Sequence, residues 1–240
     1  MGNRFFSKKL LKFYFLIFFS TFISYLYFAI RVNKDISSED ISKTELLNLD
    51  NECSNIDSFI EEVRCIRNVQ RSQLNLIKGT DCPDDDFMNL GSIKVIKEDT
   101  ACCFDRSRIT EQSLQYYGFK VRHIFLLNKK SNVLDILKPR ISSHASTEVL
   151  TSKGWLGVDS NEPFILISKT GMPNTYEKAI SSGLIKNYSD NEFYKYPSFQ
   201  FIGLYSRKGN FFAPYFLFIP EINYYDFFSN IQNIKLINPR

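Results

Sequence analysis

Hydrophobic and polar positions divide the chain into a helical first part and a part rich in strands. An unbroken apolar run covers 13–30. A stripe at helical spacing follows in Ile56, Phe59, Val63, Ile66 and Val69. Ser54 or Asp57 is expected to cap this helix. A further helix is expected from about 103 to 117, because Gly118 behind it suits a left-handed C-cap.

Strand patterns dominate after Gly118. The expected strands are 119–127, 144–150 and 154–159, with a hairpin turn at 151–154 between the last two. Later signals predict a strand at 163–168, a short helix at 174–183, a hairpin over 199–220 turning at 208–210, and a helix at 224–231. Helices followed by mostly antiparallel strands predict one α+β domain at 53–240, large enough for a real core.

The apolar run at 13–30 predicts a transmembrane helix. It holds about 18 residues without a charge, which at ~1.5 Å per residue gives a helix of ~27 Å, close to the bilayer core. Tyr25 and Tyr27 suit a membrane interface. A cleaved signal peptide is the alternative, but no Ala-x-Ala-like site precedes Arg31, which favours an uncleaved signal anchor.

The flanks of this run predict its orientation and the domain order. A basic leader at 1–12 with no acid places the N-terminus in the cytoplasm and residues after about 31 outside, the periplasm or outer face of a bacterium. Residues 31–52 are polar and acidic, and we interpret them as a stalk between the anchor at 13–30 and the domain at 53–240. The net charge is +4, and the leader's Arg4, Lys8, Lys9 and Lys12 account for it, so nucleic acid is not expected as a partner.

Five cysteines occur, Cys53, Cys65, Cys82, Cys102 and Cys103. An odd number in an exported domain leaves at least one thiol unpaired. The simplest pairing by proximity is Cys53–Cys65 and Cys82–Cys102 with Cys103 free, although four cysteines allow three connectivities. A zinc site is disfavoured because no CxxC or HxxxH spacing is present.

Thiol chemistry is indicated by the order Cys103, His144, Asp159. A catalytic thiol needs a nearby imidazole to become a thiolate, and a third group to fix the ring's tautomer. Only two histidines occur, His123 and His144, so candidate bases are few. Cys103 would stand at the N-terminus of the 103–117 helix, where unsatisfied N–H groups favour an anion. The alternative nucleophile is Cys102.

These residues resemble the transglutaminase-like superfamily of papain-like thiol enzymes. Cys103-Phe104-Asp105 is followed at the family's spacing by Gly118 and Arg122, and then by His144-Ala145, Gly154-Trp155 and Asp159. The match covers roughly residues 100–162. The resemblance implies a nucleophile-bearing helix packed on an antiparallel sheet, with Cys103, His144 and Asp159 as the catalytic triad and no metal or organic cofactor.

Neighbouring residues are expected to be structural. Asp105 should stabilise the first helical turn, Arg122 should pair with a carboxylate, Trp155 should lie in the core or a pocket wall, and His123 should be a buried structural histidine. Gln70 is a weak candidate for an oxyanion donor.

The expected function is attack of Cys103 on a peptide or carboxamide bond of a protein or peptide substrate, giving an acyl-thioester. Water would make the protein a peptidase or amidase, and an amine would make it an acyl transferase. The alternative is an inactive binding module of the same fold in an envelope or surface-polysaccharide assembly. A disulfide-exchange protein is disfavoured because Cys102 and Cys103 lack the usual two-residue spacer.

Overall fold

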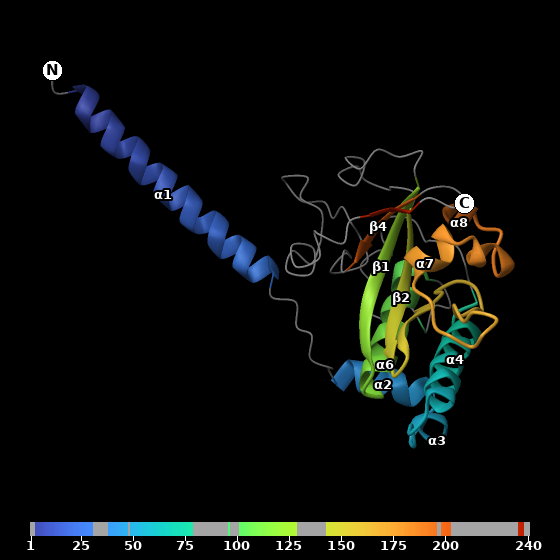
Figure 1. Cartoon of the computed structure of the whole chain (residues 1–240). Helices are drawn as coiled ribbons and strands as arrows, with labels where there is room; N and C mark the ends of the chain where they lie inside the picture. Colours follow the sequence, from blue (N-terminus) through green and yellow to red (C-terminus); the bar gives the residue numbers. More distant parts are fainter. Residues whose placement is uncertain are drawn as a thin grey trace.

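The computed structural model describes residues 3–30, 38–47, 49–78, 96, 101–128, 143–195, 198–202 and 235–237. The elements beyond the N-terminal helix form a mixed α/β body around an antiparallel sheet (Figure 1). The helices are α1 (Asn3–Ile30), α2 (Ser38–Leu47), α3 (Asp50–Cys53), α4 (Phe59–Leu76), α6 (Cys103–Tyr116), α7 (Tyr176–Ser181), the 3₁₀ helix η3 (Leu184–Asn187) and α8 (Glu192–Lys195). The strands are β1 (Lys120–Asn128), β2 (Ser143–Thr151), β3 (Gly154–Val158), β4 (Ser198–Ile202) and β5 (Lys235–Ile237).

The described strands form one sheet in the order β3-β2-β1-β4-β5, and each neighbouring pair is antiparallel. β2 and β3 form the predicted hairpin, with Thr151 opposite Gly154. Gly154 has φ +119°, a backbone conformation that side chains rarely allow. The predicted antiparallel sheet and its hairpin are therefore confirmed.

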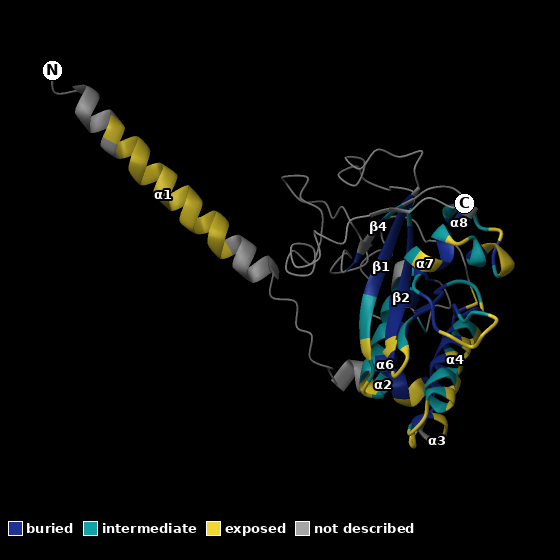
Figure 2. Cartoon of the chain, in the orientation of Figure 1, coloured by how far each residue is buried: buried dark blue, intermediate teal, exposed yellow. Residues whose placement is uncertain are grey.

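The two faces of the sheet carry different layers, because successive side chains of a strand point to opposite sides. One face packs against α6, which α2 and α4 contact in turn. Its core contains Cys65, Ile66, Val69, Leu114, Val149, Leu156 and Val158. The other face carries α7, η3 and α8 over a core of Ile124, Leu126, Phe164, Leu166, Tyr176, Ile180 and Tyr194. The strands between the two layers are largely buried (Figure 2).

The predicted helix from 103 to 117 is confirmed as α6. Ser107, Thr110 and Leu114, which share one helical face, are all buried against the sheet side. Gly118 follows with φ +84°, the left-handed conformation expected of a C-cap glycine. The helix is therefore oriented by this buried stripe.

Over its described parts, 38–47 and 49–52, the segment predicted as a stalk is packed against the domain and is not an open linker, while 31–37 and 48 lie outside the described residues. This segment forms α2 and α3, and Leu47, Leu49 and Cys53 are buried in the core beside α4. Lys43 donates from Nζ to Gln112 Oε1 at 3.1 Å, which ties α2 to α6. Its apolar positions are too few to form a visible stripe in the sequence, yet they suffice to dock the segment.

Two local predictions need correction. Ser58, not Ser54 or Asp57, caps α4, because its Oγ accepts from Glu61 N–H and Glu61 Oε2 accepts from Asp57 N–H in return. Within 163–168 only isolated bridges occur, from Ile165 to Val158 and from Ile167 to Pro173. The predicted turn at 208–210 and helix at 224–231 lie outside the described residues.

The apolar run at 13–30 lies within the single helix α1, which Figure 1 shows apart from the α/β body. The large apolar side chains described between Leu10 and Ile23 are 42% to 71% exposed. In the described part of the chain, no helix reaches the combined length and apolar character needed to cross a membrane. The membrane anchor stays a prediction.

The cysteine pairing agrees with prediction as far as it is described. Cys53 and Cys65 form a disulfide that joins α3 to α4. Cys102 is also disulfide-bonded, and its expected partner Cys82 lies outside the described residues. Cys103 is a free cysteine.

Candidate functional site

Cys103 is the first residue of α6. The preceding Cys102 is extended, and its N–H donates to Asp105 Oδ2 at 3.2 Å, so Asp105 closes the first turn as predicted. Burial raises the pKa of Asp105 to about 7, although this hydrogen bond and the charges of Arg108 and Arg106 oppose the rise. The thiol of Cys103 is half-buried and sits where the helix presents N–H groups without intrahelical partners. Such a position is one where a helix can stabilise an anion.

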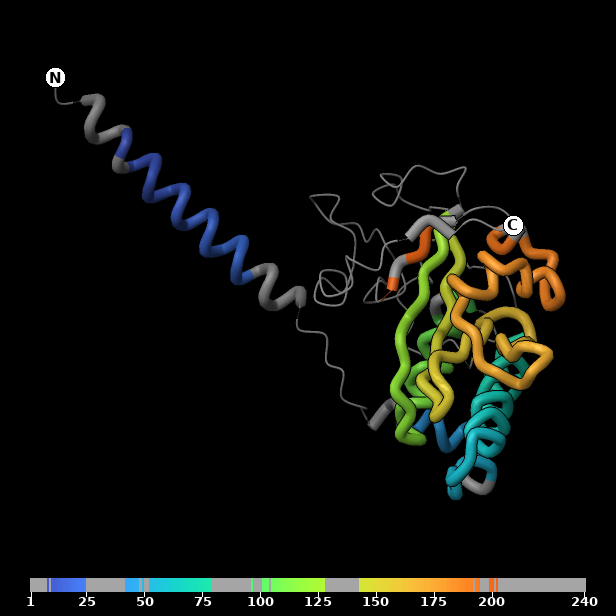
Figure 3. Tube along the Cα trace, in the orientation of Figure 1, coloured from blue at the N-terminus to red at the C-terminus, as the bar shows by residue number. Residues whose placement is uncertain are grey.

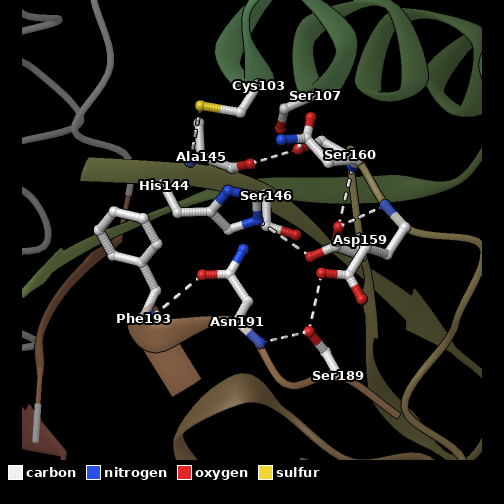
Figure 4. A network of polar contacts seen from close by, with 12 residues as sticks. Cys103, Ser107, His144, Ala145, Ser146, Asp159, Ser160, Ser189, Asn191 and Phe193 are labelled. Carbon is white, nitrogen blue, oxygen red and sulfur yellow. Dashed lines mark hydrogen bonds and ion pairs between the residues drawn. The ribbon is translucent and has the colours of Figure 1, made fainter. Parts of the chain in front are cut away.

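His144 comes to the thiol from β2. Its strand partner is Leu126, so its side chain belongs to the sheet face that carries α7 and α8. The next residue, Ala145, donates from its N–H to Cys103 Sγ at 3.4 Å, which places the sulfur against the start of β2. Figure 4 shows the sulfur of Cys103 next to Ala145, with the imidazole of His144 in the same part of β2.

Asp159 follows the end of β3 and holds the ring of His144. His144 Nε2–H donates to Asp159 Oδ2 at 3.0 Å, and both side chains are buried. The second carboxylate oxygen, Oδ1, accepts from the N–H groups of Asn161 and Glu162, each at 2.8 Å. The turn after β3 therefore fixes the carboxylate of Asp159. Because Asp159 takes Nε2 of the His144 ring, Nδ1 is the nitrogen left for the thiol of Cys103.

The electrostatics of the pair favour an ionised ring. Burial disfavours the charged form, but the charge and hydrogen bond of Asp159, with a hydrogen bond and charge from Cys103, raise the pKa of His144 to about 10. Burial also raises the pKa of Asp159, but the charge and hydrogen bond of His144 and a hydrogen bond from Tyr194 outweigh it, so the net pKa is lowered. The arrangement places the thiol, the imidazole and the carboxylate in one connected group.

Three predicted site residues are thus brought together, and the structure adds aromatic residues that the sequence did not indicate. Tyr176 and Tyr194 both donate a hydroxyl hydrogen bond to Asp159 Oδ2. The ring of Phe193 stacks on His144 with centroids 5.9 Å apart. Nothing in the local sequence marks these residues, because their role depends on packing between α7, α8 and the sheet.

The other residues of the pattern have structural partners. Arg122 Nε donates to the buried Glu148 Oε2 at 2.7 Å, which confirms the predicted carboxylate partner. The Arg122 guanidinium also lies 4.2 Å from the ring centroid of Trp155, so the half-buried Trp155 supports an ion pair rather than filling the core. Burial raises the pKa of Glu148, although Arg122 and the Tyr176 N–H oppose the rise.

Gln70 is not an oxyanion donor. Its Nε2 group donates to the carbonyl oxygens of Asp159, Glu162 and Phe164 at 2.7 to 3.0 Å. These bonds join α4 to the loop behind β3, which the Cα trace follows toward α7 (Figure 3). Gln70 therefore supports the Asp159 loop.

The structure also shows the surroundings of the alternative nucleophile Cys102 and of the second histidine, His123. Cys102 is in a disulfide, so it is not a free nucleophile beside Cys103. His123 is buried on β1 and its Nδ1 lies 2.6 Å from Glu111 Oε1, as expected of a structural histidine. Within the described residues, no group of three or more histidine, cysteine, aspartate or glutamate side chains forms a metal site.

Comparison with known proteins adds little. No family model matches the chain, and no curated protein matches it. The crystal structure of Rad4–Rad23 bound to a 6-4 photoproduct UV lesion is similar at 12% sequence identity, with a TM-score of 0.39. The similarity covers 71% of this chain and 42% of that chain. A likeness this distant carries no argument about fold or function.

Proposed function

We propose that the chain is a transglutaminase-like cysteine enzyme that acts on peptide or carboxamide bonds. The observation that carries the proposal is the free thiol of Cys103 at the N-terminus of α6, beside a His144 ring whose other nitrogen donates to Asp159. Each member of the group does what nucleophilic catalysis needs: the thiol attacks, the imidazole moves the proton and the carboxylate orients the imidazole.

In the first half-reaction, Cys103 Sγ attacks the carbonyl carbon and the carbonyl electron pair moves onto oxygen. When this intermediate collapses, the C–N bond breaks and the imidazolium proton of His144 passes to the departing amine. An acyl-thioester remains on Cys103. Water or a second amine then attacks the thioester, gives its proton to His144 and releases the thiolate. We favour water, because it is abundant at a cell surface.

We also propose that the enzyme is anchored to the inner or plasma membrane by the helix at 13–30, with the domain in the periplasm or outside the cell. The disulfide Cys53–Cys65 supports this placement, because disulfides persist in oxidising compartments. The substrate would then be a protein, a peptide or another envelope component.

Selective alkylation tests the triad without a known substrate. Iodoacetamide at pH 7 under non-reducing conditions should modify Cys103, since an ordinary thiol with a pKa of ~8.5 is only a few per cent ionised there. His144→Ala should slow the labelling about tenfold, whereas the control His123→Gln should not. Equal rates in wild type and His144→Ala would contradict the enzyme and favour the inactive binding module.

Trapping of the acyl-enzyme tests the chemistry. Incubation with an activated ester or peptide amides should add an acyl mass to Cys103, removable with hydroxylamine, and Cys103→Ser should remove the hydroxylamine-labile adduct. Addition of a primary amine separates the two reaction types, because a transferase forms the amide while a hydrolase releases the acid. Absence of any adduct with a broad panel of acyl donors would argue against acyl chemistry.

A further inference from the structure

The short helix α8 places two aromatic side chains on the His144–Asp159 pair. Tyr194 is fully buried, its ring meets that of His144 edge-on with centroids 5.7 Å apart, and its hydroxyl donates to Asp159 Oδ2. Phe193, one residue earlier, stacks on the face of the same imidazole. Consecutive residues of one helix therefore contact both members of the pair.

A chain of hydrogen bonds fixes α8 to the loop that carries Asp159. Phe193 N–H donates to Asn191 Oδ1, and Asn191 N–H donates to Ser189 Oγ. Ser189 Oγ donates to Glu162 Oε1 at 2.7 Å, and the N–H of Glu162 donates to Asp159 Oδ1. Figure 4 shows this path from Phe193 back toward Asp159. These hydrogen bonds therefore fix the position of α8 relative to the carboxylate of Asp159.

Tyr176 and Tyr194 both reach Asp159 with their hydroxyl groups, but they differ in the other hydrogen bonds that those hydroxyls make. Tyr176 also contacts Ser146 Oγ at 2.5 Å, and Ser146 Oγ donates to Val158 O at 2.7 Å. Because the Ser146 hydroxyl hydrogen goes to Val158 O, Ser146 accepts from Tyr176, so the single Tyr176 hydroxyl hydrogen is divided between Ser146 and Asp159. Tyr194 donates to Asp159 Oδ2 and also lies beside the Tyr176 hydroxyl, but among the described residues no serine hydroxyl competes for its proton, so it is the firmer donor to Asp159.

We propose that Tyr194 is a positioning residue that keeps Asp159 ionised and aimed at His144 Nε2, and that α8 exists in the site to deliver it. This inference rests on the proposed function of the Cys103–His144–Asp159 group. A phenol hydrogen bond to a carboxylate favours the ionised form, because only that form accepts at full strength. Without it, protons reach Asp159 at higher pH, the imidazolium loses its counter-charge and the thiol is protonated again.

Few other groups act on this carboxylate. Among the described residues, the titratable side chains that contact Asp159 are His144 from β2, Tyr176 from α7 and Tyr194 from α8, while Cys103 from α6 acts on the imidazole. Glu162 contacts Asp159 through its backbone N–H, and its charge acts on Tyr194. Burial and the charge of Asp159 raise the pKa of Tyr194 well above its ordinary value, so the phenol stays a donor across the working pH range.

The test compares three phenylalanine variants in the full chain by the rate of Cys103 alkylation from pH 5 to 8. Tyr194→Phe keeps the ring and removes the hydroxyl, and we expect labelling at pH 5 to slow about tenfold relative to wild type, with little change at pH 8. Tyr176→Phe should slow it only about twofold. Tyr188→Phe removes a phenol bonded to Ile167 O, away from the pair, and should leave the profile unchanged.

Imidazole NMR gives a readout that a purely structural role would not move. The chain has only two histidines, so His123→Gln identifies the ring signals of His144. We expect Tyr194→Phe to shift the Nε2–H proton signal of His144, while Tyr188→Phe leaves it in place. A Tyr194→Phe protein with a lower melting temperature but an unchanged signal and pH profile would overturn the inference.

The two proposals fail separately. If wild type and His144→Ala are alkylated at the same rate, the proposed enzyme function fails, and the NMR comparison still decides whether Tyr194 orients the pair. If His144→Ala slows alkylation but Tyr194→Phe changes neither readout, the enzyme stands and the positioning role is wrong.

Discussion

Two buried histidines stand on adjacent strands, and each meets a carboxylate, yet only His144 has Asp159 on one side of its ring and a free thiol on the other. His144 uses Nε2 for Asp159, which leaves its other nitrogen for Cys103. His123 uses Nδ1 for Glu111 at 2.6 Å, and Ser107 Oγ approaches the same nitrogen at 3.4 Å.

The thiol or hydroxyl group beside each histidine differs as well. Cys103 and Ser107 are one turn apart on α6, but Cys103 begins the helix and is half-buried, whereas Ser107 is inside it and 0% exposed. Ser107 Oγ is also bonded to Thr147 Oγ1 at 2.8 Å and to Glu111 Oε1 at 3.0 Å. Contact among a hydroxyl, an imidazole and a carboxylate is therefore not by itself the arrangement that nucleophilic catalysis needs. The ring must bridge acid and nucleophile through different nitrogens, and the nucleophile must be reachable.

The largest expected effect comes from moving the thiol one turn along α6. The double variant Cys103→Ala/Ser107→Cys places a thiol beside His123, but burial should slow its alkylation by iodoacetamide about a hundredfold or more relative to wild type. The measurement is mass-spectrometric labelling under non-reducing conditions. In urea the new thiol should label as readily as any cysteine, and wild-type rates in the folded protein would remove the distinction between the two groups.

The next largest effect is expected from replacing the two carboxylates that bond the histidines, because Asp159 and Glu111 should affect Cys103 labelling to different extents. Asp159→Asn removes the charge that stabilises the imidazolium, so labelling of Cys103 at pH 7 should fall about tenfold. Glu111→Gln should leave that rate within about twofold but cost about 1–3 kcal/mol of unfolding free energy, because it weakens buried hydrogen bonds. Labelling rates and urea denaturation test both, and a large labelling defect in Glu111→Gln would couple the two clusters.

The histidines should also differ in how stability depends on pH. The pKa of His144 is raised from 6.5 to about 10 on folding, so its stabilisation is complete below pH 6.5 and is lost as the pH rises toward 10. The urea midpoint should fall over this range in wild type and His123→Gln, and fall less in His144→Gln. Parallel curves for all three proteins would contradict an ionised His144.

The smallest effect is expected for Thr147→Val. The change removes the Oγ1 that contacts Ser107 and Glu111 while keeping a β-branched strand residue. We expect a loss of about 1 kcal/mol in unfolding free energy and no change in Cys103 labelling. A labelling defect would show that this cluster sets the position of the nucleophile.

Much of the fold was predictable where the information is local. The hairpin at 151–154 and the helix ending before Gly118 follow from neighbouring residues, so both are confirmed. The docking of 38–52 was not predictable, because it depends on Leu47 and Leu49 meeting α4, which no local pattern reveals. The predicted strand at 163–168 was also not found, since Ile165 and Ile167 form only isolated bridges, to Val158 and Pro173.

The candidate site also contains residues that the sequence predicted and residues that it did not. The order of Cys103, His144 and Asp159 identified the group before any geometry was known. Its supporting phenols were hidden, since Tyr176 and Tyr194 are two of 13 tyrosines and no local motif marks them. They become part of the site only because α7 and α8 cover the sheet face on which His144 lies, next to Asp159 after the end of β3.

The amino-acid sequence alone determined the helix that ends before Gly118, the hairpin at 151–154, the choice of only two histidines and the cysteine expected to stay free, because these depend on composition, periodicity and short spacings. Only the tertiary structure decided which nitrogen of each imidazole meets its carboxylate, which nucleophile is reachable and which phenols donate to Asp159. Those outcomes depend on burial and on atoms brought together from distant segments, and the strength of a charge or hydrogen bond is set by that environment.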